Sequence, residues 1–413
     1  MINFNLKQSL VRIKANPDLI LSVLYLLWCL VLPWSVAAMQ IMLGLLIITL
    51  IALSVWRKRS PVQFHRIYFF IGLYLLVNLI TLLLSSDRPK TFKGILSTEW
   101  IILAVPFIIS LPVPARWRKY SFRVLLFSAA LAGVYGIIQF FTGVDPIRNK
   151  TLGQFGEYYR AVGGYGAILS YAGNQLMAFG VAFAFFLTSS PKRKNKIYYF
   201  VLLTILFLSI MASQTRSTFV AVLVVLVLGF LLTHNRKFVY VPGMILVFLV
   251  AVVFYFPGLE SRLVNMFNPA ENYTRINLWK SSLQIIADHP WFGIGHGVFN
   301  DYLEVYEVPG FYGAGRHAHN DLLNIAVING LSGLISWLLI WGAWFGFAVR
   351  RYRSLIYVFD DHRIVLGAIL AVAGILVAGL FQCYYTDLEN NLFWWFMATI
   401  VLQIELDQKR RPG

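Results

Sequence analysis

A short polar run near residue 320 contains a histidine that could act as a general base at the start of a helix. The run leads directly into a long apolar segment and reads Arg316-His317-Ala318-His319-Asn320-Asp321. Asn320 or Asp321 can cap that helix, because short polar side chains accept hydrogen bonds from the free amides of a first turn. The positive end of the helix dipole disfavours imidazolium, so we expect His319 to be a neutral imidazole that can accept a proton.

Two glycines, Gly330 and Gly333, follow in the same apolar segment. If the helix is continuous, Gly330 lies about three turns beyond His319 and on the same face. Small residues at this spacing are typical of close approach between membrane helices. The alternative is a polar helix start followed by ordinary membrane glycines.

Other segments place arginines where an anion could bind. Arg216 lies in a connection too short to leave the membrane surface, Ser213-Gln214-Thr215-Arg216-Ser217-Thr218. A lone arginine there is costly unless it reaches water or meets an anion, and its hydroxyl and amide neighbours favour an anion pocket. Arg275 begins an amphipathic segment. Arg160 belongs to a basic and aromatic loop over residues 143–164 that suits sugar or phosphate contact, although its tyrosines are equally typical of a membrane interface.

These residue types suggest a particular class of reaction. Arginine forks bind phosphate oxygens in pairs and keep their charge at any relevant pH. Arg216, Arg275 and Arg316 therefore suit a reaction whose leaving group is phosphate or pyrophosphate, with His319 deprotonating the acceptor hydroxyl. His317 and His319 have no cysteine or third histidine beside them, so we expect no metal centre and no cofactor.

The elements that must position these side chains are membrane helices. Of the 413 residues, 59% are hydrophobic and 13% are charged, whereas a soluble domain has roughly 25% charged residues. Windows of about 20 apolar residues predict an all-α integral membrane protein with about 12 spans. The spans are approximately 19–35, 37–56, 67–85, 95–113, 124–142, 165–189, 197–213, 218–233, 239–257, 321–349, 363–381 and 391–405. The chain then divides into helices one to nine (1–257), a long outer loop with an amphipathic helix (258–320), and the last three helices with a tail (321–413).

The placement of lysine and arginine predicts that both ends of the chain are cytoplasmic. With a cytoplasmic amino terminus, 24 of the 35 cations fall in inner segments, and 12 of the 18 acids fall in outer ones. The inner loops are then 57–66, 114–123, 191–196, 234–238 and 350–362. The net charge of +17 follows this positive-inside bias, so it does not indicate a nucleic-acid partner.

The outer loop is predicted to contain one amphipathic helix over residues 274–289. Asn272 or Thr274 would cap it, Pro290 would end it, and Lys280 lies within it. Its apolar residues recur at helical spacing, and they are Ile276, Trp279, Leu283 and Ile286.

Two further features have several interpretations. The glycine-rich sequence Gly293-Ile294-Gly295-His296-Gly297 lacks the spacing of a dinucleotide-binding motif, so we interpret it as a turn. Glu99 is an ionisable residue inside a span and hence a functional candidate by default. A wetted or arginine-paired structural role for Glu99 is equally consistent with its position.

Three segments together resemble the O-antigen ligase and polymerase superfamily. His319-Asn320, nine residues and then Gly330-Leu331-Ser332-Gly333 match its HN-x9-GxxG pattern. Two other segments are similar to that family: Gln214-Thr215-Arg216-Ser217-Thr218, and Arg275 followed by Asp288-His289-Pro290-Trp291-Phe292-Gly293-Ile294-Gly295. The match covers roughly residues 210–340. Elsewhere the likeness is one of length, span count and a single long outer loop.

The resemblance implies a metal-independent, inverting glycosyltransferase of the membrane GT-C type. It would take a glycan from undecaprenyl pyrophosphate on the periplasmic side of the bacterial inner membrane. A ligase would pass O-antigen to a sugar hydroxyl of lipid A–core, in lipopolysaccharide biosynthesis. By motif, Arg216 and Arg275 would bind the pyrophosphate and His319 would activate the acceptor. Further candidates for substrate contact are Arg160, Lys280, Arg316, His317 and Asn320.

Other functions stay open at this point. The superfamily also contains repeat-unit polymerases, which use the same donor chemistry, and protein O-oligosaccharyltransferases, which are usually longer. A transporter or flippase for the lipid-linked sugar is a different class. We find no inverted repeat of broken helices, and the cations collect on one face rather than at mid-bilayer depth. A ligase is therefore the favoured interpretation.

Overall fold

The computed structural model describes residues 18–189, 193–233, 268, 272–310, 317–355 and 359–409, and they are almost entirely helical. The helices are α2 Asp18–Val31, α3 Val36–Trp56, α4 Ile67–Leu84, α5 Arg88–Ser110, α6 Ala115–Thr142, η1 Gly163–Tyr165, α7 Ile168–Leu187, α8 Arg193–Ser213, α9 Arg216–Thr233, α12 Tyr273–Asp288, α13 Phe299–Tyr306, α14 Asp321–Ser354, α15 Phe359–Gly379 and α16 Leu388–Lys409. Two small antiparallel hairpins pair β1 Val144–Asp145 with β2 Lys150–Thr151, and β3 Gln154–Phe155 with β4 Tyr158–Tyr159.

Nine of the described helices are long and apolar enough to cross a membrane, namely α3 to α9, α14 and α15. The chain is therefore a multi-pass membrane protein, as its composition predicts. Several helices extend beyond the predicted apolar windows. For example, α5 begins at Arg88 because the side chain of Asp87 accepts a hydrogen bond from the Lys90 amide and caps it. The predicted span 239–257 lies outside the described residues.

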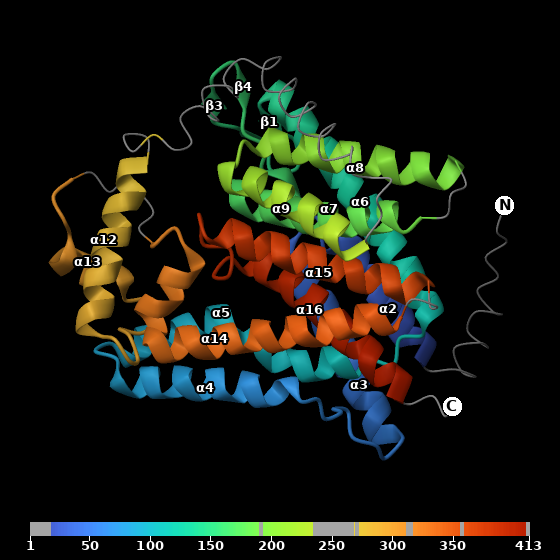
Figure 1. Cartoon of the computed structure of the whole chain (residues 1–413), viewed down its shortest axis with the longest axis horizontal. Coiled ribbons are helices and arrows are strands. Elements are labelled where there is room, and N and C mark those ends of the chain that lie inside the picture. Colours follow the sequence, from blue (N-terminus) through green and yellow to red (C-terminus); the bar gives the residue numbers. More distant parts are fainter. Residues whose placement is uncertain are drawn as a thin grey trace.

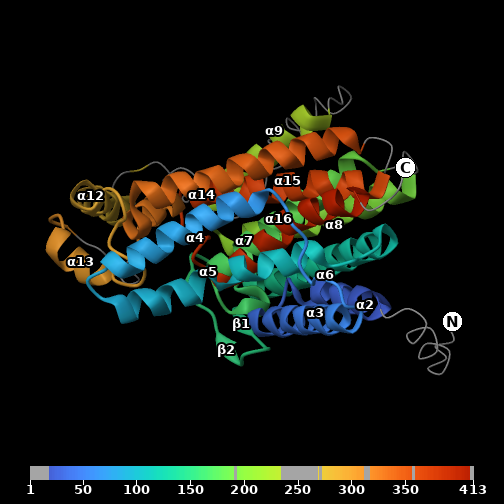
Figure 2. The ribbon, with the colours of Figure 1, turned by 90° about the horizontal axis from the view of Figure 1, so that it is seen from below.

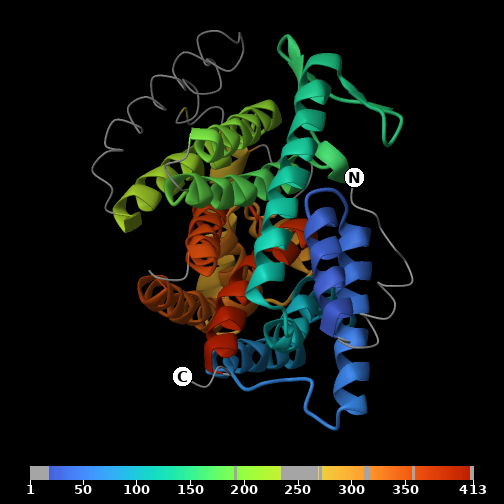
Figure 3. The same ribbon diagram turned by 90° about the vertical axis from the view of Figure 1, so that its right-hand side faces the viewer.

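Helix α7 lies at the centre of the bundle. It packs against α8, α9 and α15, and most of its residues are buried. Figure 3, which views the bundle from one end, shows α2 beside α6 and α3 beside α2 at the edge of the bundle. Small residues allow the closest contacts, because a Cβ atom on Gly180 would lie only 2.9 Å from the Ala371 backbone nitrogen of α15.

One end of the bundle gathers the loops that the charge pattern predicts to be cytoplasmic. The five acids predicted on that side all face basic residues there: Asp18 with Arg57, Asp360 with Lys119, Asp361 and Asp407 with Arg118, and Glu405 with His65. Arg118 is 1% exposed and joins α6 to α15 and α16. These loops therefore share one end, which is what a common compartment requires. The loop 234–238 lies outside the described residues.

Helices α12 and α13 lie across the opposite end of the bundle (Figures 1 and 2). The bounds of α12 are within one residue of the prediction, whereas α13 was not predicted. The predicted apolar face of α12 is not the face that the protein buries. Leu283 on that face is 56% exposed, whereas Leu278 and Ile285 are buried. Ile285 of α12 and Val327 of α14 belong to one buried apolar cluster, and Ser281 and Ser282 of α12 are also buried. An apolar stripe near a membrane does not need protein to cover it.

Candidate active site

A cleft of about 410 Å³ lies at the end of the bundle that carries α12. Its lining comes from the start of α7, the α8–α9 turn, α12 and the loops near residues 160 and 382. The lining residues are Arg160, Ile168, Leu169, Gln214, Thr215, Arg216, Ser217, Asn272, Arg275 and Gln382. Three guanidinium groups thus share the cleft, and no carboxylate belongs to its described lining. Burial chiefly, and also the charge of neighbouring arginines, lowers the pKa of Arg160 and of Arg275. Because arginine keeps its proton through such shifts, the cleft favours an anion.

Arg216 is the first residue of α9, directly after a two-residue turn from α8. Gln214 in this turn has a φ of 51°, in the left-handed region that is costly for a residue with a Cβ atom. The turn is tied to the loop after α15 by a hydrogen bond of 2.9 Å between the Ser217 and Tyr384 hydroxyls. The connection is therefore the tight turn that its length predicts. The positive end of the α9 dipole adds to the attraction of an anion at Arg216.

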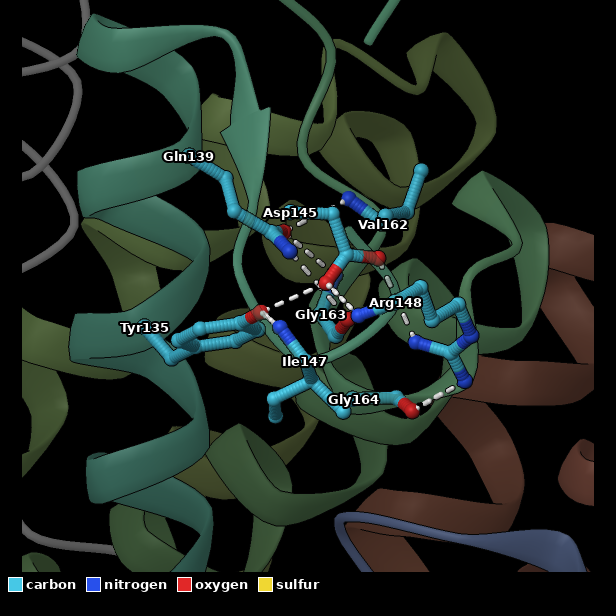
Figure 4. A network of polar contacts seen from close by, with 8 residues as sticks. All are labelled: Tyr135, Gln139, Asp145, Ile147, Arg148, Val162, Gly163 and Gly164. Carbon is cyan, nitrogen blue, oxygen red and sulfur yellow. Dashed lines mark hydrogen bonds and ion pairs between the residues drawn. The ribbon is translucent and has the colours of Figure 1, made fainter. Parts of the chain in front are cut away.

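The loop that carries Arg160 is anchored to the end of α6, as Figure 4 shows. The Gln139 side-chain oxygen accepts hydrogen bonds from the amides of Val162 and Gly163, at 3.1 and 2.8 Å. Arg160 itself donates from Nε to the Ser213 carbonyl at 3.3 Å. These bonds place Arg160 beside the α8–α9 turn, and hence in the same cleft as Arg216.

A second anchor in this loop has a structural role. The buried Asp145 carboxylate accepts a hydrogen bond of 2.6 Å from the Tyr135 hydroxyl and faces Arg148 at 3.4 Å (Figure 4). Arg148 also donates to the Gly164 carbonyl. The guanidinium of Arg148 is thus committed to the loop, and Arg160 is the loop cation that reaches the cleft.

Arg275 lies in the first turn of α12, as predicted, and Asn272 at the N-cap position also lines the cleft. The predicted cap is not formed, because the side chain of Asn272 makes no capping hydrogen bond and Thr274 lies inside the helix. Lys280 is exposed and is not among the cleft residues. Five residues correspond to about 140° around a helix, so Arg275 and Lys280 point in different directions.

His319 borders the cleft through Gln382. Nδ1 of His319 contacts Oε1 of Gln382, which also lies 3.3 Å from Nε2 of His317. The two imidazole rings lie 4.0 Å apart between centroids. Because an amide oxygen only accepts hydrogen bonds, neutral His319 holds its proton on Nδ1 and keeps a lone pair on Nε2. Burial chiefly, followed by the neighbouring His317, lowers the pKa of His319 to about 4, so its imidazole is neutral at pH 7.

The helical phase expected between His319 and Gly330 is wrong. Both histidines precede α14, which begins at Asp321, and His319 has a φ of 48°. Gly330 is not helical either, since its φ is 68° and its ψ is −173°, and α14 is kinked there. The neutrality of His319 also has a different main cause from the one expected, because burial outweighs the other effects on its pKa.

The kink at Gly330 receives the turn over residues 290–295 rather than another helix. Four backbone hydrogen bonds join them: Ile294 to Val327, Gly295 to Ile328, Leu331 to Pro290, and Ser332 to Trp291, at 3.0, 2.9, 2.7 and 3.2 Å. A Cβ atom on Gly330 would lie 2.3 Å from the Trp291 carbonyl carbon, which leaves no room for a side chain. The expected close approach at this glycine is real, but its partner is the turn that follows α12.

Asn320 fixes the start of α14 against the loop after α15. Its side-chain oxygen accepts the Leu323 amide at 3.0 Å, and its side-chain nitrogen donates to the Leu380 carbonyl at 2.9 Å. Asn320 rather than Asp321 is therefore the cap, and its side chain is already committed. Asp321 is buried and accepts the Tyr385 amide at 3.0 Å. Both residues thus hold the loop that presents Gln382.

Glu99 belongs to the same supporting structure. Its carboxylate is buried and accepts hydrogen bonds from the hydroxyls of Tyr74 and Tyr385, at 2.8 and 2.9 Å. The structural alternative considered from the sequence, in which Glu99 contacts water or an arginine, is therefore wrong. Glu99 instead holds Tyr385, three residues beyond Gln382, from within the bundle.

Residues 200–338 match the family model described as O-Antigen ligase. Over this segment the chain is similar to the O-antigen ligase family. It contains Arg216, Arg275 and His319, the residues that the motifs single out, and the match supports the O-antigen ligase and polymerase superfamily. No curated protein matches the chain.

Two polar residues of the cleft lining come from outside the matched O-antigen ligase segment. Arg160 precedes it and was a candidate from sequence, whereas Gln382 follows it and was not. The only sequence signal for Gln382 is a polar residue at the end of an apolar span, which does not indicate a contact with residues 317–319. Arg316 lies outside the described residues. Among the described histidines, cysteines and acids, no group of three could hold a metal ion.

Proposed function

We propose that this protein transfers O-antigen glycan from undecaprenyl pyrophosphate to a sugar hydroxyl of lipid A–core. The observation that carries the proposal is a cleft with three arginines, no carboxylate in its described lining, and a neutral histidine at its border. A pyrophosphate ester is the leaving group that such a cleft would stabilise. The family match supports ligase or polymerase activity more broadly.

In the proposed reaction, His319 Nε2 takes the proton from the acceptor hydroxyl. The acceptor oxygen then attacks the anomeric carbon of the donor glycan and forms the new glycosidic bond. The bond from that carbon to the pyrophosphate oxygen breaks with its electron pair, and Arg216, Arg275 and Arg160 hold the charge that develops on the pyrophosphate. Attack opposite the leaving group inverts the anomeric centre. The arginines supply the positive charge at the leaving group, so the proposed reaction is metal-independent.

Donor binding would also make His319 a stronger base. Burial, His317 and Arg275 all lower its pKa. A bound pyrophosphate brings negative charge close to Arg275 and therefore favours imidazolium, which raises the pKa of His319. Proton transfer from the acceptor would then be favoured only when the donor is in place.

The charge pattern supports an orientation for this reaction. The end of the bundle that gathers the basic loops would face the cytoplasm, and the cleft would face the periplasm. We place the protein in the bacterial inner membrane, where undecaprenyl pyrophosphate and lipid A–core would reach the cleft from the same leaflet.

The deciding experiment incubates purified protein with undecaprenyl pyrophosphate-linked glycan, with and without lipid A–core. A ligase forms glycosylated lipid A–core only when the acceptor is present. Longer lipid-linked glycans formed without acceptor would instead identify a repeat-unit polymerase of the same superfamily. No new glycosidic bond in either mixture, with movement of the donor across proteoliposome membranes, would identify a transporter and contradict the proposal.

A matched pair of variants on α12 tests whether the cleft is the site. Arg275→Gln removes a cation that lines the cleft, whereas Lys280→Gln removes one that is exposed on the same helix outside it. We expect Arg275→Gln to lose most transfer and donor retention, and Lys280→Gln to keep both. Equal effects of the two substitutions would mean that general charge, rather than the cleft, governs donor binding.

A further inference from the structure

A second basic recess lies at the end of the bundle opposite the cleft. It has a volume of about 560 Å³ and lies between the start of α4 and the ends of α14 and α16. Its lining residues are Arg66, Phe347, Arg350, Arg351, Ser354, Glu405 and Gln408. We call it the basic groove. It shares no residue with the cleft, and the proposed glycan transfer gives it no role.

The charge of the basic groove favours an anion. In its described lining, three arginines accompany a single carboxylate, Glu405. Arg350 lies over the Phe347 ring at 5.3 Å from the centroid, which leaves its guanidinium at the rim of an apolar wall. Guanidinium groups of this kind bind phosphate oxygens in pairs, and the wall suits the glycerol and first acyl carbons of a lipid.

The depth of the groove matches a phospholipid headgroup. About 20 residues of α14 separate the Gly330 kink from Arg350, and at about 1.5 Å per residue they extend about 30 Å. That length equals the hydrocarbon thickness of a typical bilayer, about 30 Å, so a span that begins at the kink would place Arg350 at the level of the headgroups. Phe64, two residues before Arg66, is 79% exposed, as is typical of aromatic side chains at a membrane interface.

We propose that the basic groove binds the phosphate of an anionic phospholipid in the leaflet at this end of the protein. Arg66 and Arg350 would contact the phosphate from opposite sides. Arg351 would form the floor, because its guanidinium is held by the Ser354 hydroxyl and the Ile404 carbonyl, each at 3.3 Å. A lipid held there would bridge α4, α14 and α16.

The test is binding of phosphatidylglycerol and phosphatidylcholine to the purified protein, measured by native mass spectrometry. The double variant Arg66→Gln/Arg350→Gln removes two groove cations. Arg59→Gln/Arg353→Gln is the matched control, since it removes two exposed cations nearby that do not line the groove. Loss of one arginine should weaken the affinity for an anionic lipid about fivefold. The groove double variant should therefore bind phosphatidylglycerol about 30-fold more weakly than wild type. The control should stay within about twofold. If the groove double variant folds poorly, Arg350→Gln against Arg353→Gln gives the same comparison at about fivefold.

Three results would overturn the proposal. Equal weakening by the groove and control variants would indicate general attraction to a basic surface. Equal binding of phosphatidylcholine and phosphatidylglycerol would remove the role of charge. Competition by glycerol 3-phosphate or inorganic phosphate as strong as that by short-chain phosphatidylglycerol would indicate a soluble phosphate ligand. Because lipid binding is measured without glycan donor, none of these outcomes depends on the proposed transferase activity.

Discussion

Replacing Gln382 tests whether the orientation of His319 matters as the cleft geometry suggests. Gln382 Oε1 is the acceptor that contacts Nδ1 of His319 and lies 3.3 Å from Nε2 of His317. Gln382→Ala leaves Nδ1 without this partner, so the imidazole can rotate or move its proton to Nε2. One net hydrogen bond of about 1 kcal/mol corresponds to about fivefold, and loss of the residue that orients a functional histidine typically costs about 10- to 100-fold.

We therefore expect Gln382→Ala to lower kcat about 10- to 100-fold. The KM for donor should change little, because the arginines hold the pyrophosphate. Steady-state transfer at varied donor concentration separates the two constants. Gln154→Ala, on an exposed hairpin at the same end of the bundle, controls for loss of a glutamine. Wild-type kcat in Gln382→Ala, or a raised KM with unchanged kcat, would refute the orienting role.

Gln382→Glu tests the contact between residue 382 and His319 through the pH dependence of activity. His319 must be neutral to act as a base. In the donor-free enzyme, whose groups kcat/KM reports, its pKa of about 4 keeps wild-type kcat/KM independent of this group between pH 6 and 8. A carboxylate at position 382 favours imidazolium and raises the pKa of His319. The acid limb of kcat/KM should therefore move upward into this range, with a lower kcat/KM at pH 6 than at pH 8. A flat profile in Gln382→Glu would contradict the contact.

Three further predictions concern the chemistry and one the orientation. Arg216→Lys should lose about 10- to 150-fold in transfer rate, because an ammonium cannot replace a guanidinium fork and a charge-assisted bond is worth about 1.5–3 kcal/mol; near wild-type turnover would show that charge alone suffices. Transfer should survive exhaustive chelation, and rescue of a chelated, inactive enzyme by magnesium or manganese would disprove the arginine-based mechanism. His319→Ala should lose about 10²–10⁴-fold with donor retained, and His319→Gln should stay inactive. His317→Ala should lose less, since His317 contacts Gln382 and the His319 ring but is not the proposed base. An active His319→Gln enzyme would rule out the base. A cysteine at Ser60 should be labelled by impermeant thiol reagents only from the cytoplasmic side, and labelling from outside would reverse the orientation.

The membrane helices and the segregation of charge were predictable because each depends on local composition. A helix of about 20 apolar residues needs no tertiary partner to be recognised, and neither does a loop rich in arginine. The arginines could be singled out individually for a similar reason, since a cation next to the bilayer core needs water or an anion. From the sequence, these arginines were expected to lie on the same outer face, but not to meet in one cleft.

Contacts between distant segments were not predictable from the sequence alone. Gln382 lies more than 60 residues after His319, and no periodicity connects them. The buried face of α12 followed its contact with α14 rather than its apolar stripe, because lipid and protein both accept apolar side chains. Glu99 was ambiguous because its two tyrosine partners, Tyr74 and Tyr385, come from different parts of the chain.

The kink at Gly330 shows why its glycine matters even though the expected helical face does not exist. The turn after α12 forms backbone hydrogen bonds on both sides of Gly330, and any side chain there would collide with Trp291. Arg275 lies in the first turn of α12, and His319 lies just before α14, so this contact positions the helix of the proposed pyrophosphate-binding residue against the helix that follows the proposed base. Gly293 has a φ of 65°, and a Cβ atom on it would lie 2.6 Å from the Gly330 nitrogen, so two glycines are needed at the same contact. The spacing between the histidine motif and its glycines therefore sets how far along α14 from His319 the turn after α12 packs.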